Sequence, residues 1–334
     1  MSNLLVLSQS DVNELLGKGN CEAAIEIVDL MADAFAAFTD GHLNPEEKAK
    51  LAQSPVRIGV STDSHRVLFM PSRMNNTTSI KIVSVPTKDG LSGLPASVLV
   101  INEETASVEA IMNGADLTAV RTAAGSGVAT SYYADPNAKN LVVFGAGAQG
   151  RSHVDMMVAV RPSLERVAIW NRGEPRRTKL IEELKIAYPK VKFVSANENL
   201  ETEVRNADII CTCTNSTEPV LFGAWLKQGV HLNCVGSYRM DMHEVDAETI
   251  KRVQVITVDS VTACEAEAGE LVKSSKPEDW TEIGEIILSE RNTVLDIEKI
   301  TLFKSVGISL QDSAIAGLMV KKVKNTKLGS VVPF

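Results

Sequence analysis

The sequence predicts an α/β protein with two domains: a doubly wound parallel sheet, and an α+β domain with an antiparallel sheet. In residues 55–112, short β-rich runs follow one another with brief turns between them. This spacing favours antiparallel pairing, because parallel strands need long crossover connections. In residues 140–258, apolar β-branched runs mostly alternate with helix-like segments, as in a parallel sheet that is covered on both faces. A length of 334 residues also suits about two domains.

Composition and charge narrow the kinds of partner. Hydrophobic residues make up 44% and charged residues 23%, which excludes a disordered or collagen-like chain. The net charge of −8 disfavours nucleic acid as a partner. No apolar run reaches the roughly 18 residues of a membrane-spanning helix, and the start of the chain lacks the basic head of a signal peptide. We therefore expect a cytosolic protein that binds small molecules or further copies of itself.

The cysteines predict neither a metal site nor disulfides. There are five, at positions 21, 211, 213, 234 and 264, and none forms a CxxC spacing. We expect buried free thiols in a reducing compartment, and no metal.

The first domain begins with a helix and continues as strands. Residues 21–39 place Ala24, Val28, Met31 and Phe35 on one helical face, and Gly41 is expected to end that helix. The expected strands are Val56–Ser61, Arg66–Pro71, Ser79–Pro86, Ala96–Asn102 and Ala106–Met112.

A helix of mostly small residues, at 114–133, leads into the parallel sheet, and we expect it to be tightly packed or to lie beside a ligand. A late amphipathic helix, at 307–324, follows that sheet and is expected to return to the first domain. The predicted domains are therefore residues 1–120 with 306–334, and residues 121–305. The expected parallel strands are Leu141–Phe144, Val167–Trp170, Val191–Val194, Ile209–Cys213, Leu232–Val235 and Val255–Val258.

A glycine-rich turn joins the first parallel strand to the next helix. It reads Gly145-Ala146-Gly147-Ala148-Gln149-Gly150 and follows an apolar strand directly, which is the context that makes a GxGxxG motif specific. Gly145 permits the sharp turn, Gly147 lets backbone amides approach a pyrophosphate, and Gly150 allows close packing of helix and strand. The helix N-terminus favours the phosphates electrostatically. The second domain is thus predicted to be a Rossmann dinucleotide-binding domain.

The end of the next strand bears on the choice of dinucleotide. An acidic residue there normally binds the ribose hydroxyls of NAD, but this chain has Asn171 and Arg172. A guanidinium pairs well with a 2′-phosphate, so NADP(H) is favoured and NAD(H) remains open. Arg176 and Arg177 fit a solvated basic turn better than Arg172 does.

Ligands of doubly wound sheets lie beyond the carboxyl ends of the strands. Thr214 and Asn215 end the fourth strand, and Val235 and Gly236 end the fifth. We expect both pairs to line the nicotinamide side of the site. Gly236 suggests close approach of the backbone to a ligand, with an ordinary turn as the alternative.

Six motifs in order resemble the ornithine cyclodeaminase/mu-crystallin family, from the first helix to residue 307. They are Leu117-Thr-Ala-Val-Arg121-Thr122, Gly145-Ala-Gly-Ala-Gln149, Trp170-Asn-Arg, Thr217-Glu-Pro-Val-Leu-Phe-Gly, His231-Leu-Asn-Cys-Val-Gly236 and Phe303-Lys304-Ser305-Val-Gly307. The resemblance implies a homodimer in which the N-terminal sheets of two subunits pack together. It also implies a nicotinamide cofactor beside a small amino or imino acid, with Thr122 and Ser305 among the cofactor contacts.

The resemblance places three catalytic cations in this chain. A carboxylate-binding arginine falls on Arg57, the active-site lysine on Lys81 and a second arginine on Arg121. The chemistry is consistent: two guanidiniums can clamp a carboxylate, and burial can lower the pKa of a lysine towards neutrality. Structural salt bridges are the alternative for each of the three. Arg73 is a further cation for which a surface position is expected.

The sequence differs from part of this family at one position, and that position distinguishes the reactions that family members catalyse. Its cyclodeaminases and its archaeal alanine dehydrogenase carry an aspartate two residues after the glycine that matches Gly236, and here that position is Tyr238. A phenol of pKa about 10 is a poor base at neutral pH. Mu-crystallin also lacks this aspartate. It has a different aspartate two residues after an arginine, and this chain has the same residue at Asp241. Asp241 would have to turn inward to replace the missing carboxylate.

The sequence therefore predicts an NADPH-dependent reductase of a small cyclic imino acid, such as piperideine- or pyrroline-2-carboxylate. Two alternatives stay open. One is an ornithine cyclodeaminase that forms proline and ammonia with catalytic NAD, against which Tyr238 argues. The other is a non-catalytic, NADPH-dependent binder of a small ligand, because mu-crystallin relatives bind thyroid hormone in the substrate cleft.

Overall fold

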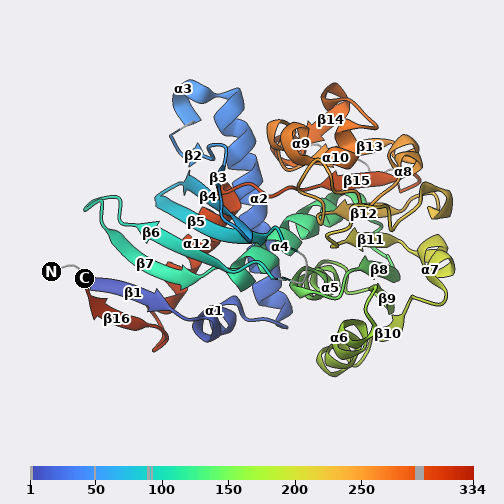
Figure 1. The fold of residues 1–334 in the computed structure, drawn as a ribbon, viewed down its shortest axis with the longest axis horizontal. Helices are drawn as coiled ribbons and strands as arrows, with labels where there is room; N and C mark the ends of the chain where they lie inside the picture. The colour runs from blue at the N-terminus through green and yellow to red at the C-terminus, as the bar shows by residue number, and fades with distance from the viewer. Residues whose placement is uncertain (1–2, 49, 89–90, 92, 290–296) are drawn as a thin grey trace. The chain divides into compact units, whose positions relative to one another are not determined.

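The structure, a computed structural model, describes residues 3–48, 50–88, 91, 93–289 and 297–334. The chain divides into two compact units (Figure 1), Met1–Arg121 with Ile308–Phe334, and Thr122–Gly307. Arg121 thus belongs to the first unit, and the second unit extends to Gly307. The division falls inside helix α4 (Ala115–Tyr133). The predicted fold class, α/β with one parallel sheet and one largely antiparallel sheet, is confirmed.

The first unit is built on the predicted antiparallel meander. Strands β4, β5, β6 and β7 pair with their neighbours in sequence order, and β2 and β3 both pair with β4. Their bounds are Ala52–Gln53 for β2, Ile58–Ser61 for β3, His65–Met74 for β4, Thr77–Pro86 for β5, Ala96–Ile101 for β6 and Val108–Asn113 for β7.

The two ends of the chain extend this sheet, which the sequence analysis did not predict. Strand β1 (Asn3–Leu7) runs parallel to β7, and β16 (Ser330–Pro333) runs antiparallel to β1. Both strands are short, and β16 is exposed along its whole length. Their pairing depends on contacts between residues far apart in sequence, which a local pattern does not show.

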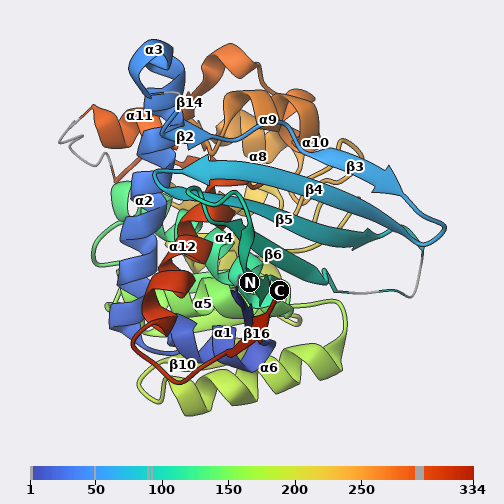
Figure 2. The ribbon, with the colours of Figure 1, turned by 90° about the vertical axis from the view of Figure 1, so that its left-hand side faces the viewer.

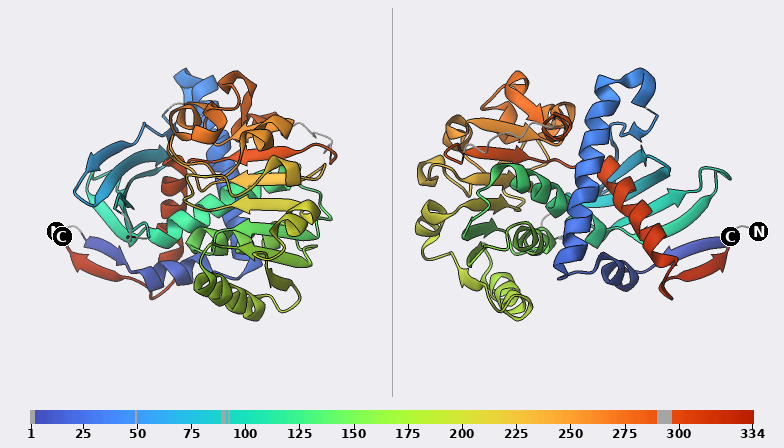
Figure 3. Two further views of the ribbon diagram at one scale, coloured as in Figure 1. Left: turned by 45° about the vertical axis from the view of Figure 1, so that its right-hand side comes forward. Right: turned by 180° about the vertical axis from the view of Figure 1, so that it is seen from behind.

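Two helices cover one face of this sheet (Figures 2 and 3). Helix α2 (Cys21–Leu43) packs against α12 (Leu310–Val323), and α12 lies along β4 and β5. The prediction that Gly41 ends this helix is wrong: Gly41 is buried within α2, which ends at Leu43 with Asn44 as its C-cap. One internal glycine costs only about 1 kcal/mol, and Pro45 follows. The smaller helices of this unit are α1 (Gln9–Leu16) and α3 (Pro45–Lys48).

The second unit contains the predicted parallel sheet, in the order β10-β9-β8-β11-β12-β15-β13-β14. The chain reverses direction across the sheet between β8 and β11, which is where doubly wound folds bind ligands. Strands β14 and β15 were not predicted, because both are short and carry polar end residues. The bounds are Asn140–Phe144 for β8, Arg166–Trp170 for β9, Lys192–Ser195 for β10, Ile209–Thr212 for β11, His231–Cys234 for β12, Val255–Val258 for β13, Trp280–Glu282 for β14 and Thr301–Lys304 for β15.

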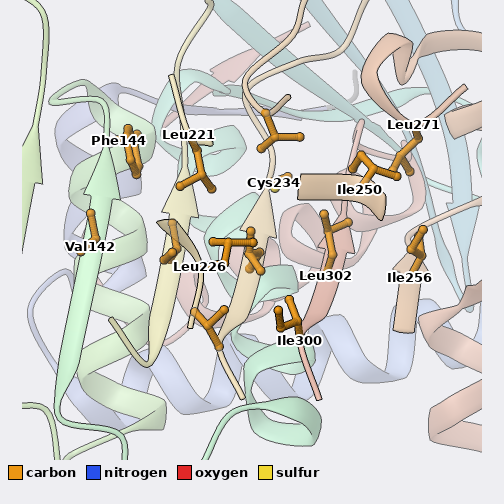
Figure 4. Packing of buried hydrophobic residues seen from close by; sticks show 14 of the residues in the cluster. Val142, Phe144, Leu221, Leu226, Cys234, Ile250, Ile256, Leu271, Ile300 and Leu302 are labelled. Atoms are coloured by element: carbon orange, nitrogen blue, oxygen red, sulfur yellow. The ribbon is translucent and has the colours of Figure 1, made fainter. Parts of the chain in front are cut away.

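Helices and a continuous apolar layer cover this sheet. Figure 4 shows the layer, with Val142 of β8, Cys234 of β12 and Leu302 of β15 among its side chains. The helices are α5 (Ala148–Val160), α6 (Glu174–Ala187), α7 (Leu200–Asn206), α8 (Ala247–Arg252), α9 (Val261–Glu267), α10 (Gly269–Val272) and α11 (Ile283–Leu288), with short 3-10 turns at Gly223–Trp225 and Pro277–Asp279.

The small-residue helix α4 is tightly packed, as predicted. Ser126 is hydrogen-bonded to His153 of α5, with 2.9 Å between Oγ and Nε2. Thr130 accepts a hydrogen bond from Asn233 Nδ2 of β12 at 2.9 Å. Burial lowers the pKa of His153 to about 4, so this histidine is neutral at physiological pH.

Every cysteine is a free thiol. Residues 211, 234 and 264 are buried and residue 213 is half-buried, whereas Cys21 is exposed, contrary to the expectation of burial. Within the residues that the structure describes, no helix combines the length and the apolar character needed to cross a bilayer.

Candidate active site

Lys81 lies on β5, on the face of the sheet that α12 covers. Buried and half-buried residues alternate along β5, so Ser79, Lys81 and Val83 share the covered face. The Lys81 side chain is only 2% exposed, and its Nζ lies 2.8 Å from Asp312 Oδ2 of α12. A buried ammonium is costly unless it is paired, and Asp312 provides the partner.

Arg121 of α4 binds the same carboxylate. Its Nε donates to Asp312 Oδ1 at 3.1 Å, and its Nη1 donates to Gln311 Oε1 at 2.9 Å. Gln311 in turn donates through Nε2 to the Arg121 carbonyl oxygen at 3.3 Å. Lys81 and Arg121 therefore share Asp312, and the three side chains form one buried group within the first unit.

Arg57 belongs to the same electrostatic group. It is half-buried, just before β3, and its positive charge acts on Lys81. Both predicted arginines thus act on Lys81. Arg73, in contrast, forms a bidentate pair with Glu103 at 2.8 and 2.7 Å near the surface, in agreement with the expectation.

The pKa of Lys81 is lowered to about 7. Burial is the largest cause, and the positive charges of Arg121 and Arg57 act in the same direction, while Asp312 opposes them. A lysine with a pKa near 7 exchanges a proton readily at physiological pH, which suits general acid–base chemistry.

Buried serines fix the helix that carries Asp312. Ser313 Oγ lies 2.6 Å from Ser72 Oγ of β4 and 2.7 Å from Ser79 Oγ of β5. Ser72 Oγ also donates to the Ser309 carbonyl oxygen at 2.7 Å. Because Ser313 follows Asp312 directly, these bonds set the position of the carboxylate relative to Lys81.

The glycine-rich turn has the geometry expected of a phosphate-binding turn. Gly145 has φ 109°, a conformation that favours glycine, and Gly147 is the N-cap of α5. A Cβ on Gly150 would lie 1.9 Å from the Gly145 carbonyl oxygen, so only a glycine at position 150 allows α5 to pack this closely against the turn after β8. A Cβ on Gly147 would meet no atom of the described chain within 4 Å. Space is therefore open where the backbone amides would face a pyrophosphate, and the turn fits a dinucleotide.

The residues that follow β9 differ in their burial and in their hydrogen bonds. Asn171 Oδ1 accepts a hydrogen bond from the Ala146 amide at 3.1 Å, so Asn171 helps to hold the glycine-rich turn. Arg172 and Arg176 are exposed. Arg177 is buried and donates to the Asn171 carbonyl oxygen at 2.9 Å, so the expectation that it is solvated is wrong.

Glu244, which the sequence analysis did not identify, joins the loops at the carboxyl ends of β11 and β12 through hydrogen bonds. Glu244 Oε1 accepts from the Thr214 amide at 2.6 Å, and Glu244 Oε2 accepts from the Gly236 amide at 2.7 Å. A Cβ on Gly236 would lie 2.1 Å from the Thr214 carbonyl oxygen. The close approach that Gly236 permits is therefore to the neighbouring loop. Val235 is buried and Asn215 is exposed.

A second buried carboxylate holds the loop after β15. Asp259 Oδ2 accepts from Ser305 Oγ and from the Gly307 amide, both at 2.7 Å. Thr122 is buried in α4. The cofactor roles predicted for Ser305 and Thr122 remain predictions.

Asp241 does not take the place of the missing family aspartate. Its side chain is 64% exposed and pairs with Arg239, whose Nε and Nη2 donate at 3.1 and 3.0 Å. Tyr238 packs against the apolar layer of the second unit.

Asp312, Gln311 and Glu244 are the main residues that the sequence analysis did not identify. Asp312 and Gln311 lie in the first turns of α12, where residues 310–316 are all buried and a polar residue needs a partner. Periodicity in the sequence indicates neither this complete burial nor the cation that serves as the partner.

The comparisons with known proteins decide the family. The family profile for "Ornithine cyclodeaminase/mu-crystallin family" matches residues 7–327. The chain belongs to this family. Among its relatives is a Delta(1)-pyrroline-2-carboxylate reductase of Bacillus cereus, 30% identical over 344 residues that cover 99% of this chain and 100% of the relative. Another is the ketimine reductase mu-crystallin of Rattus norvegicus, 33% identical over 272 residues that cover 79% and 83%.

A solved structure of a family member has the same fold. The Thermococcus litoralis Delta(1)-pyrroline-2-carboxylate reductase, determined in complex with NADH and L-proline, has a TM-score of 0.85 and 28% sequence identity. The similarity covers 98% of this chain and 99% of that one. An archaeal alanine dehydrogenase dimer with bound NAD, with a TM-score of 0.86 at 23% identity, also shares the fold.

Two glycines of the turn should respond differently to alanine. Gly150→Ala places a methyl group against the Gly145 carbonyl oxygen, so we expect it to lower the free energy of unfolding by about 1–3 kcal/mol. Gly147→Ala projects into open space, and its unfolding free energy should change by less than about 0.5 kcal/mol, with the affinity for a nicotinamide dinucleotide lowered roughly tenfold. Chemical denaturation and calorimetric titration with the dinucleotide measure the two quantities. Equal destabilisation by both substitutions would contradict this account of the turn.

Proposed function

We propose that the protein reduces a small cyclic imino acid, such as piperideine- or pyrroline-2-carboxylate, with NADPH as the favoured cofactor. The observation that carries the proposal is the buried group of Lys81, Arg121 and Asp312, in which the lysine has a pKa of about 7. The names of the family relatives, pyrroline-2-carboxylate reductase and ketimine reductase, support the same class of substrate.

Arg57 and Arg121 would bind the carboxylate of the substrate. Guanidinium groups match a carboxylate through paired hydrogen bonds. Arg121 is already oriented by Asp312 and Gln311, so little conformational entropy is lost when it binds a ligand. The role of these arginines is to hold the imino acid with its C=N bond at a fixed place.

Lys81 would supply the proton. Its ammonium donates to the ring nitrogen, which makes the imine carbon more electrophilic, and the neutral amine is stabilised by burial and by the two arginines. A bound reduced nicotinamide supplies the hydride that this carbon accepts. The product is the corresponding cyclic amino acid, with one new C–H bond and one new N–H bond.

The glycine-rich turn would hold the pyrophosphate of the cofactor, and Arg172 would contact the 2′-phosphate of NADPH. Arg172 is exposed at the end of β9, and no carboxylate occupies the position of Asn171 to repel that phosphate. Thr214 and Gly236 would lie along the nicotinamide, as their place after β11 and β12 suggests.

A second copy of the chain would cover the outer face of the first sheet. Ile58, Phe69 and Ile82 stand in register on β3, β4 and β5, on the face opposite to Lys81. Ile58 is 65% exposed and Val60 is 52% exposed. A sheet with one solvated face normally carries polar residues there, so this apolar face suits a homodimer.

Lys81→Met should abolish turnover without loss of cofactor binding. Removal of a general acid slows the reaction by at least about 100-fold, whereas the NADPH affinity should stay within about twofold. Absorbance of NADPH follows turnover with five- and six-membered cyclic ketimines, and titration follows binding. Lys321→Met, which changes an exposed lysine of α12, serves as the control.

Two results would contradict the proposal. An unchanged kcat in Lys81→Met would remove Lys81 from the mechanism. In the unaltered protein, turnover of ornithine without net reduction of cofactor would indicate a cyclodeaminase, and absence of turnover with every imino acid would favour a ligand-binding protein.

The pH dependence of kcat/KM should report the ionisation of Lys81. Lys81 must be protonated to act as an acid, so kcat/KM should fall as the pH rises through about 7. Asp312 raises the pKa of Lys81, so Asp312→Asn should move this fall to lower pH. Asp241→Asn, which breaks only a surface pair, should leave the pH profile unchanged. Identical profiles for Asp312→Asn and the unaltered protein would contradict the role of Asp312.

Arg172→Ala should discriminate between the two dinucleotides. Loss of one guanidinium–phosphate contact should weaken NADPH binding roughly tenfold and leave NADH binding unchanged. Arg176→Ala, at another exposed arginine close by, is the control and should alter neither affinity. Equal affinities for NADPH in Arg172→Ala and the unaltered protein would overturn the preference for NADPH.

Ile58→Glu combined with Val60→Glu should convert the dimer into a monomer. A charge placed in an apolar interface loses its hydration without a partner, so association should weaken by more than about 100-fold. Ile186→Glu changes an equally apolar residue of α6 that is 84% exposed, and should leave the oligomeric state as it is. Analytical ultracentrifugation measures the masses, and a monomeric unaltered protein would refute the proposed dimer.

A further inference from the structure

Three charged side chains are buried beneath the carboxyl edge of the parallel sheet. They are Glu244, in the segment between β12 and α8, Glu270 of α10, and Lys304, the last residue of β15. None of the three is more than 2% exposed. The reaction proposed above uses none of them, yet burial of charge is costly and calls for an explanation.

Lys304 and Glu270 form an ion pair. Lys304 Nζ lies 2.8 Å from Glu270 Oε1 and donates to the Ser237 carbonyl oxygen at 2.7 Å. Ser237 Oγ donates to the same Glu270 oxygen at 2.6 Å. Burial alone would lower the pKa of Lys304, but the negative charges of Glu270 and Glu244 outweigh it and raise that pKa. Lys304 is therefore charged.

Among the residues that the structure describes, no cation forms an ion pair with Glu244, but hydrogen-bond donors surround its carboxylate. Its two oxygens accept from the amides of Thr214 and Gly236, from Thr214 Oγ1 at 2.8 Å and from Thr212 Oγ1 at 2.8 Å. Burial and the negative charge of Glu270 raise the pKa of Glu244 above its ordinary value, against the opposing effects of Lys304 and of the hydrogen bonds from Thr214. The Glu244 amide donates to Glu270 Oε2 at 2.6 Å, which joins the two carboxylates into one network.

With both carboxylates ionised, the network has one more negative than positive charge. Asp259, buried just after β13 and hydrogen-bonded to Ser305, adds another carboxylate to the same edge. The groups that Glu244 holds directly include Thr214 and Gly236, the two residues that the proposed function places along the nicotinamide.

We propose that Glu244, Glu270 and Lys304 set the oxidation-state preference of the bound cofactor. The oxidised nicotinamide ring carries a positive charge and the reduced ring is neutral, so a fixed negative charge beneath the ring stabilises the oxidised form selectively. This inference rests on the proposed function, because it requires the nicotinamide to lie on the loops of Thr214 and Gly236. In the proposed reaction, the same charge makes the bound cofactor a stronger reductant.

The test compares the affinities of the two cofactor forms in charge variants. Isothermal titration calorimetry with NADP⁺ and with NADPH, and in parallel with NAD⁺ and NADH, gives the ratio of the two dissociation constants, oxidised over reduced. Glu244→Gln removes a negative charge and should raise this ratio about tenfold, whereas Lys304→Met removes a positive charge and should lower it by a similar factor. Glu165→Gln, at an exposed position before β9 on the opposite edge of the sheet, should leave the ratio unchanged.

A double variant separates charge from packing. Lys304→Met with Glu270→Gln removes the ion pair but keeps the net charge, so its ratio should return to that of the unaltered protein even if it is less stable. A purely structural network would weaken both cofactor forms equally. Equal changes in both dissociation constants for Glu244→Gln and for Lys304→Met, the two variants that change the net charge, would therefore overturn the inference. Failure of the unaltered protein to bind either form would instead overturn the proposed function.

Discussion

The carboxylate of Asp312 connects three parts of the chain that are far apart in sequence. It lies on α12 near the end of the chain, and it binds Lys81 of β5 and Arg121 of α4. Each of these ions alone would be unstable inside the unit, since burial of an unpaired charge costs several kcal/mol. When all three are present, the carboxylate of Asp312 stabilises both buried cations, Lys81 and Arg121. The serines that join α12 to β4 and β5 fix this arrangement.

The same constraint explains the acid–base character of the lysine. One carboxylate shared between Lys81 and Arg121 does not fully offset the effects of burial and of the neighbouring arginines. The pKa of Lys81 therefore lies near neutrality, whereas Lys304, with Glu270 and Glu244 as neighbours, has a raised pKa. Two buried lysines of one chain thus differ in proton affinity because the local balance of charge differs.

Local patterns in the sequence were sufficient for much of the fold and for part of the site. The glycine-rich turn, the meander and the parallel strands follow from residue spacing, and the family motifs indicated Lys81, Arg121 and Arg57. The pairing of β1 with β7, the insertion of β15 between β12 and β13, and the contacts of Asp312 and Glu244 depend on residues far apart in sequence. Such contacts are determined by tertiary packing, which periodicity does not report. The burial of Arg177 was missed for another reason: its guanidinium donates to the carbonyl oxygen of Asn171 only six residues earlier, and the composition of this turn suggests a solvated arginine instead.

The most direct test of this account is the titration of Lys81 itself. Protein labelled with ¹³C at lysine Cε allows each lysine to be followed by NMR as the pH is varied, and the resonance missing from Lys81→Met identifies the residue. We expect one lysine resonance with a midpoint near pH 7, well below the ordinary value of about 10.4. If the Lys81 resonance titrates with the other lysines above pH 10, the buried charge balance described here is wrong.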